Sequence, residues 1–222
     1  MVETSERQLS DILSEFARTL LTDFPIQEIL DHLVDRIVKA MPITGAGVTL
    51  ISETLSPHHV AASDERALAY VKLQTALEEG PCVAAYRTGK AVAIPDLRED
   101  DEFPSFGPQA REAGLGAVFS FPLCHEDLRL GALDLYRDTL GPLSDEDMVV
   151  AQTLADVASA YLVNAQVRAD LLQSSVHAND LALHDALTGL PNRALLIERI
   201  EHALRGGRPT GKCRRRTDKR PI

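Results

Sequence analysis

The chain has 222 residues, of which 45% are hydrophobic and 25% are charged, and its formal net charge is −10. This composition is ordinary for a globular protein, and no apolar run approaches the ~20 residues that a membrane-spanning helix needs. The N-terminus lacks the basic and then apolar layout of a signal peptide, so the sequence predicts a cytoplasmic protein with no membrane partner.

The predicted elements begin with two amphipathic helices. Residues 5–22 place Leu9, Ile12, Phe16 and Leu20 at intervals of three and four, which is typical of one apolar helix face. We therefore expect an N-terminal helix over residues 1–22, before the first domain. Pro25 opens the second helix at its favoured early position, and the buried stripe of that helix is expected to be Ile26, Ile29, Leu30, Leu33 and Ile37.

Five strands follow, with helical segments between them. The strands are predicted from β-branched, apolar stretches bounded by Gly, Pro and Asp, at residues 45–52, 58–63, 91–96, 117–123 and 129–137. Helical spacing returns at residues 64–77, 82–87 and 109–113, and residues 125–128 form a hairpin turn. This order predicts an α+β fold with a central antiparallel sheet flanked by helices.

Four motifs in this region resemble the GAF family. They are EEGPCVAAYRTGKAVAIPDL, AGLGAVFSFPL, LRLGALDLYR and LSDED, and they occur in the family's order. The resemblance implies a GAF/PAS-like sensory domain over residues 23–162, with a cleft for a small ligand and helices that support dimerisation. Candidate residues of the ligand pocket are Cys82, Tyr86, Phe103, Phe106 and Phe119. The alternative is that these aromatic side chains only fill the core.

A long helix is predicted from Ser144 onward. Ser144 is a good N-cap, and the carboxylates of residues 145–147 lie in the first turn, where the helix dipole favours negative charge. Apolar positions then alternate at three and four residues, as in a coiled coil. The predicted seam of a parallel homodimer is Met148, Ala151, Ala155, Ala158, Leu162, Ala165, Ala169, Leu172, Val176, Asn179 and Leu183. The alternative is that this helix is the last one of a monomer and that its Ala-rich face lies on neighbouring helices. A second stripe, Val150, Leu154, Val157 and Tyr161, is expected to pack on the domain's own sheet.

The stretch DALTGLPNR at residues 185–193 resembles the opening turn of the GGDEF family, the diguanylate cyclases. In that family the turn follows a signalling helix, here residues 163–184, and couples it to the catalytic domain. The resemblance assigns this coupling role to Asp185, Thr188, Gly189, Asn192 and Arg193. The family's metal-binding Asp strand, its guanine-contacting residues and the GGDEF hairpin have no counterpart in the sequence. Residues 185–204 are thus interpreted as a truncated, inactive start of such a domain.

The charge is unevenly distributed. Residues 205–222 contain eight Lys or Arg and one Asp, which leaves 15 Lys or Arg and 32 Asp or Glu for residues 1–204. An acidic body repels nucleic acid, and the basic tail has no aromatic residue on which a base could stack. We expect the tail to be disordered and do not expect nucleic acid as a partner.

No residue is assigned a catalytic or metal-binding role. The cysteines Cys82, Cys124 and Cys213 have no metal-ligand spacing, and His58, His59 and His125 do not fix a coordination geometry for a metal ion or haem. The ligand and any cofactor stay unidentified, and covalent attachment is not expected. Cys82 follows Gly-Pro at a predicted helix start, where a thiol pKa can fall, but it is interpreted first as a small buried core residue. The sequence therefore predicts a non-enzymatic sensory and dimerisation module. The alternatives are a diguanylate cyclase and a GAF-type methionine sulfoxide reductase that uses Cys82.

Overall fold

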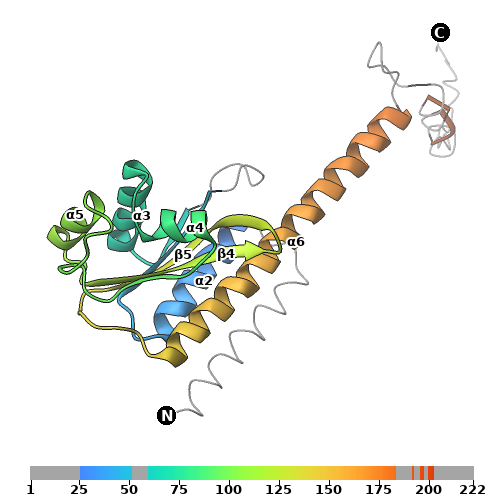
Figure 1. Ribbon diagram of the computed structural model, residues 1–222. Helices are drawn as coiled ribbons and strands as arrows, with labels where there is room; N and C mark the ends of the chain where they lie inside the picture. The colour runs from blue at the N-terminus through green and yellow to red at the C-terminus, as the bar shows by residue number, and fades with distance from the viewer. Residues whose placement is uncertain (1–25, 52–59, 184–191, 193–195, 198–199, 203–222) are drawn as a thin grey trace, which may run out of the picture. The chain divides into compact units, whose positions relative to one another are not determined.

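A computed structural model describes residues 26–51, 60–183, 192, 196–197 and 200–202 of the chain. The expected N-terminal helix and the basic tail lie outside these residues. The chain divides into two units, residues 1–167 and 168–222, and the folded domain belongs to the first. Within the described part of the first unit a single sheet is flanked by helices, as the sequence predicted (Figure 1).

The sheet has five strands in the order β2-β1-β5-β4-β3, and every neighbouring pair is antiparallel. The strands are β1 (Gly45–Leu50), β2 (Val60–Ala62), β3 (Val92–Ile94), β4 (Ala117–His125) and β5 (Leu128–Arg137). The longest strands, β4 and β5, form a hairpin in the middle of the sheet. Its turn is tighter than predicted, because β4 continues to His125 and Glu126 adopts a left-handed φ of 53°.

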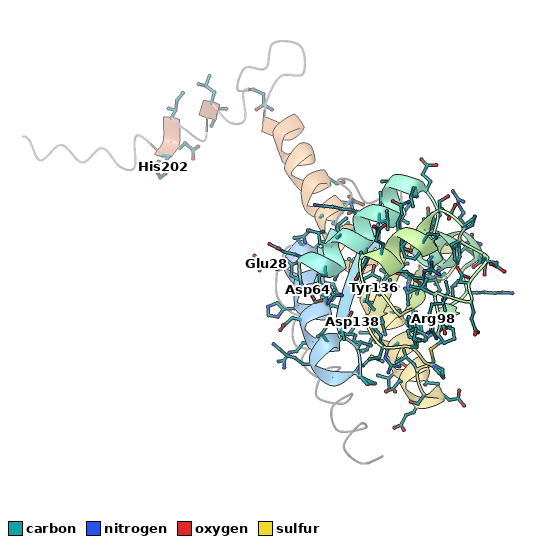
Figure 2. All side chains as sticks on the ribbon, turned by 90° about the vertical axis from the view of Figure 1, so that its left-hand side faces the viewer. Glu28, Asp64, Arg98, Tyr136, Asp138 and His202 are labelled. Carbon is teal, nitrogen blue, oxygen red and sulfur yellow. The ribbon has the colours of Figure 1, made fainter. Side chains whose placement is uncertain are left out.

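Helices cover both faces of the sheet, and Figure 2 shows the described side chains on this framework. On one face lie α2 (Ile26–Ala40) and the first part of α6 (Asp145–Leu183), and on the other lie α3 (Glu65–Leu77), α4 (Pro81–Thr88) and α5 (Phe106–Glu112) (Figure 1). Because side chains alternate along a strand, each strand contributes to both layers. In β4, Phe119 and Phe121 pack with α2 and α6, whereas Val118 packs with α3 and α5.

The central position of β5 requires a glycine opposite β1. Gly131 pairs with Leu50, and a Cβ atom built on it would lie 1.9 Å from the carbonyl oxygen of Thr49. No side chain fits there, so Gly131 is what allows the two strands to pair at this register.

Helix α6 begins as the sequence predicted. The hydroxyl of Ser144 accepts a hydrogen bond from the backbone N–H of Asp147 at 3.1 Å, which is the expected N-cap interaction. By length and composition, residues Asp145–Leu171 would pass as a membrane span. That is weak evidence, because Leu154 and Leu162 of this stretch are buried in the domain core.

Candidate functional site

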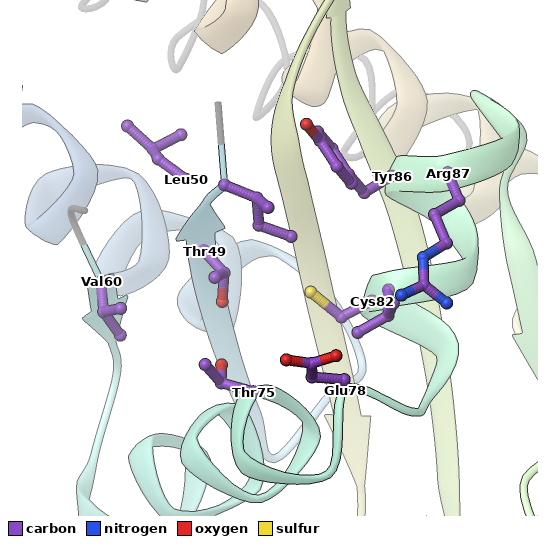
Figure 3. A pocket seen from close by; sticks show the side chains of 10 residues that line it. Thr49, Leu50, Val60, Thr75, Glu78, Cys82, Tyr86 and Arg87 are labelled. Carbon is purple, nitrogen blue, oxygen red and sulfur yellow. The ribbon is translucent and has the colours of Figure 1, made fainter. Parts of the chain in front are cut away.

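A cavity of about 300 Å³ opens on the face of the sheet that α3 and α4 cover (Figure 3). The end of β1, the start of β2, the last turn of α3 and the first two turns of α4 form its walls. Its lining residues are Thr49, Leu50, Ile51, Val60, Thr75, Glu78, Cys82, Val83, Tyr86 and Arg87. The lining is mainly apolar with a few polar groups, and the volume is at the lower end for small-ligand sites.

The corner between α3 and α4 places two of these residues. Glu78 ends α3 in a left-handed conformation with φ 49°, and Gly80 has φ 137°. A Cβ atom on Gly80 would lie 2.6 Å from the Gln74 side-chain oxygen. Glycine is therefore required for the chain to pass this close to α3. Pro81 then opens α4 and brings Cys82 into the first turn beside the cavity.

A buried hydrogen-bond network lies behind the cavity wall and centres on Asp134 of β5. The Gln74 side-chain amide donates to the Asp134 carboxylate at 3.0 Å, and the Tyr136 hydroxyl donates to it at 3.0 Å. The Ser120 hydroxyl donates to the other carboxylate oxygen. Gln74 in turn accepts the backbone N–H of Cys82 at 2.8 Å. The network thus joins the central strands to the start of α4.

Burial dominates the electrostatics of this network. It raises the pKa of Asp134 to about 6, although the donated hydrogen bonds act in the opposite direction. Burial also raises the pKa of the Cys82 thiol well above its ordinary value, and the nearby Asp134 charge adds to this shift. The Cys82 thiol is therefore protonated at neutral pH and is a poor nucleophile.

Thr49 contributes a buried polar atom to the cavity wall. Its side chain is 5% exposed, and its hydroxyl finds no hydrogen-bond partner within residues 26–51 and 60–183. The hydroxyl lies near enough to the Cys82 thiol to oppose the rise of the thiol pKa slightly. An unsatisfied buried hydroxyl beside a cavity is the kind of group that a ligand or a water molecule satisfies.

The structure brings together two of the five predicted pocket residues, Cys82 and Tyr86. Phe103 and Phe106 instead fill the core beneath α3 and α5, with Phe106 in the first turn of α5. Phe119 lies on the opposite face of the sheet, in the core with α2 and α6. For these three phenylalanines the structure corresponds to the core-filling alternative.

The structure corrects the first half of the predicted dimer seam. Ala151, Ala155, Ala158 and Leu162 are at most 2% exposed in the single chain, because they pack in the domain's own core. They are not available to a second chain. Met148 and Ala165 are partly buried against the same core, and Ala169 is exposed. The seam side chains outside the described residues are Leu172, Val176, Asn179 and Leu183.

The other predicted sites are only partly covered. Of the coupling turn, only Asn192 is described, and its carbonyl accepts the Leu196 N–H at 3.0 Å. Asp185, Thr188, Gly189 and Arg193 lie outside the described residues, as do His58 and His59. Within the described part of the chain, no group of three His, Cys, Asp or Glu side chains is placed to hold a metal ion.

Sequence reasoning missed the network and much of the cavity lining. One signal was present, since Asp134 interrupts an apolar strand that helices were expected to cover. A carboxylate in such a strand is buried and needs several hydrogen-bond donors. The donors Gln74 and Ser120 come from other elements, so no local pattern connects them to Asp134. Glu78 and Arg87 carried no signal, since charged helix ends usually face solvent.

Comparison with known proteins agrees with this fold. Residues 25–163 match the family model of the GAF domain. Among curated proteins, no match to the chain was found. The GAF domain of a phosphoenolpyruvate-protein phosphotransferase from Coxiella burnetii is 14% identical, with a TM-score of 0.58, and the match covers 74% of this chain and 98% of that domain.

Two further solved structures have the same fold. A domain assigned to a two-component sensor histidine kinase of Sinorhizobium meliloti is 16% identical, with a TM-score of 0.56 and coverage of 68% of this chain and 99% of that one. The free methionine-R-sulfoxide reductase of Neisseria meningitidis is 14% identical, with a TM-score of 0.53 and coverage of 72% and 91%. At these identities the likeness extends to the fold alone.

Proposed function

This chain belongs to the GAF domain family, and on that premise we propose that it is a cytoplasmic signal-sensing module that binds a small molecule without covalent attachment. The observation that carries the proposal is the cavity between β1, α3 and α4. Its wall contains the buried hydroxyl of Thr49, which has no hydrogen-bond partner within the described residues, and its α4 side is fixed to the central strands through Gln74 and Asp134. These hydrogen bonds would therefore transmit the effect of ligand binding in the cavity to the strands of the sheet.

Filling the cavity tests this function. Val83→Phe adds a ring to the cavity wall, so compounds that raise the melting temperature of the wild type should not raise that of the variant. A ligand at 100 times its Kd stabilises the folded state by about 2.7 kcal/mol, which thermal-shift screening of a metabolite library detects. Leu128→Phe, on the hairpin away from the cavity, should respond like the wild type. The proposal fails if no compound distinguishes Val83→Phe from the wild type, or if the purified protein carries a covalently bound chromophore.

The reductase alternative has less support. A reductase of this kind needs Cys82 as a thiolate nucleophile, whereas burial beside Asp134 keeps the thiol protonated. The other described cysteine, Cys124, lies at the end of β4. Cys124 therefore belongs to the β4–β5 hairpin, whereas Cys82 belongs to the start of α4, so the two cysteines lie on different elements.

We also propose that residues 185–204 are the start of a GGDEF-type domain and that this chain makes no cyclic di-GMP. The support is the resemblance of residues 185–193 and the lack of that family's metal-binding carboxylates in the sequence. Phosphodiester formation needs metal ions and positioned phosphates. Incubation with GTP and Mg²⁺ should give no cyclic di-GMP by chromatography. Product above a control without protein would establish the cyclase alternative.

We also propose a homodimer through α6. Because the first half of the predicted seam is buried in the domain core, the dimer would use another face of the helix. Val149 and Val167 are 66% and 50% exposed, and their separation of 18 positions in sequence equals about five helical turns, so both lie on one face. Sedimentation at micromolar concentration should show a dimer. The double variant Val149→Glu, Val167→Glu should be monomeric, because each change would bury an unpaired charge. Arg168→Glu, about a quarter turn from this face, should remain dimeric. A monomeric wild type would refute the proposal.

A further inference from the structure

Two opposite charges line the cavity without meeting each other. Glu78 follows the last turn of α3, and Arg87 lies in the second turn of α4. Both residues are part of the cavity wall, and Figure 3 shows that a different element carries each of them. Glu78 and Arg87 do not form an ion pair with each other, and neither forms one with any other residue in the described ranges. Two solvent-exposed charges of opposite sign therefore line one small cavity.

The backbone holds Glu78 in an uncommon conformation. Its φ of 49° lies in the left-handed region, which glycine adopts more readily than glutamate does. The N–H of Glu78 donates to the carbonyl of Thr75, and the start of α4 is fixed by the hydrogen bond from the Cys82 N–H to the Gln74 side chain. This left-handed cap ends α3, as at many helix C-termini, and turns the chain so that Glu78 lies beside the cavity.

The rest of the cavity suits an apolar group. Leu50, Ile51, Val60 and Val83 supply aliphatic surface, and Tyr86 adds an aromatic ring. A volume of about 300 Å³ restricts the ligand to a small molecule. A phosphate ester would be attracted by Arg87 but repelled by Glu78, and a simple amine would be attracted by Glu78 but repelled by Arg87, whereas a zwitterion can pair with both. A neutral ligand would leave both charges unused.

We propose that the ligand is a small zwitterion with an apolar body, of the free α-amino-acid class. Its ammonium group would bind the Glu78 carboxylate, its carboxylate would bind the Arg87 guanidinium, and its side chain would enter the cavity toward Thr49 and Cys82. This inference rests on the proposed sensory function and specifies the chemistry of the same site.

Isothermal titration calorimetry with the full chain tests the charges of the ligand. The probes are L-valine, L-leucine, L-methionine and L-phenylalanine, and the best of them should bind at least tenfold more tightly than glycine. For leucine, the matched analogues are 4-methylpentanoate, which lacks the ammonium group, and 3-methylbutylamine, which lacks the carboxylate. Equivalent analogues serve the other probes, and each analogue should bind at least tenfold more weakly than its parent.

Variants then assign the two charges to residues. Glu78→Gln should weaken amino-acid binding at least tenfold and remove the preference over the analogue without an ammonium group. Arg87→Gln should remove the preference over the analogue without a carboxylate. Both residues are exposed, so the melting temperature of the free protein should change little. Lys90→Gln and Glu65→Gln, exposed charges outside the cavity, are the matched controls and should bind like the wild type.

The outcomes separate this inference from the function on which it rests. If neutral or singly charged compounds bind as well as amino acids, and Val83→Phe blocks them, the zwitterion is wrong and the sensory function stands. If Glu78→Gln and Arg87→Gln bind amino acids like the wild type, the assignment of the charges is wrong. If no compound binds the cavity, in the library or among the probes, both proposals are wrong.

Discussion

Gly131→Ala is expected to lose at least about 4 kcal/mol of unfolding free energy, the range in which single substitutions are exceptional. The new methyl group would lie 1.9 Å from the Thr49 carbonyl oxygen, which belongs to the backbone of the paired strand. To relieve this clash, β1 must move away from β5, and that movement breaks the pairing between the two strands. Urea denaturation followed by circular dichroism measures the loss. Because Thr49 also lines the cavity, the affinity for a ligand should fall together with the stability.

Gly107→Ala is the matched control for this substitution. Gly107 is the second residue of α5, and the nearest atom to a Cβ there is Asp100 Oδ2 at 3.7 Å, an ordinary contact. Alanine favours the helix over glycine by about 0.5–1 kcal/mol, so this variant should be slightly more stable than the wild type. A Gly131→Ala protein with wild-type stability would show that β1 and β5 do not pair at the register described.

Asp134→Asn is expected to change the pH dependence of stability. In the unfolded chain an aspartate ionises near pH 4, whereas burial raises the pKa of Asp134 to about 6 in the folded protein. Between these values the folded state holds a proton that the unfolded state has lost. The stabilisation is therefore complete below about pH 4 and is lost as the pH rises through about 6. The difference corresponds to about 3 kcal/mol.

Asparagine has nearly the same shape and does not titrate, so the variant should lack this part of the pH profile. Its oxygen can accept the hydrogen bonds of Gln74 and Tyr136, and its amide can donate to Ser120. Denaturation at pH 4, 5, 6 and 7 should show the wild type losing about 3 kcal/mol relative to the variant. Asp101→Asn, an exposed substitution, should give a profile parallel to the wild type. A parallel profile for Asp134→Asn would mean that Asp134 does not ionise in this range.

Most of the fold could be predicted because its signals are local. Alternating and β-branched stretches mark all five strands, and the N-cap at Ser144 marks the start of α6. The confirmed α+β architecture follows from the order of these elements. The packing partner of the α6 stripes could not be predicted from local sequence. Ala151 and Leu162 are apolar at a spacing that suits either a partner chain or the domain's own core. Only the packing of the sheet distinguishes the two.

The candidate site was less predictable. Cys82 was found because Gly-Pro precedes it, and Tyr86 lies one helical turn further along. Phe119 was assigned to the wrong face of the sheet, because both faces of β4 are buried and the residue types do not show which helices each face meets. Glu78 and Arg87 reach the cavity only because the left-handed corner after α3 turns the chain back toward β1. That corner depends on contacts between α3 and α4, which short-range patterns do not contain.

The order of the strands also affects how readily the protein aggregates at high concentration. Strands β2 and β3 form the two edges of the sheet, and each has three residues, whereas the central β4 and β5 have nine and ten. An exposed edge is a template on which another chain can add a strand, and such addition leads to aggregation. Two short edges offer few free backbone groups, so the long apolar strands are enclosed in the middle. The arrangement protects a sheet rich in Val, Leu and Phe from joining its neighbours edge to edge.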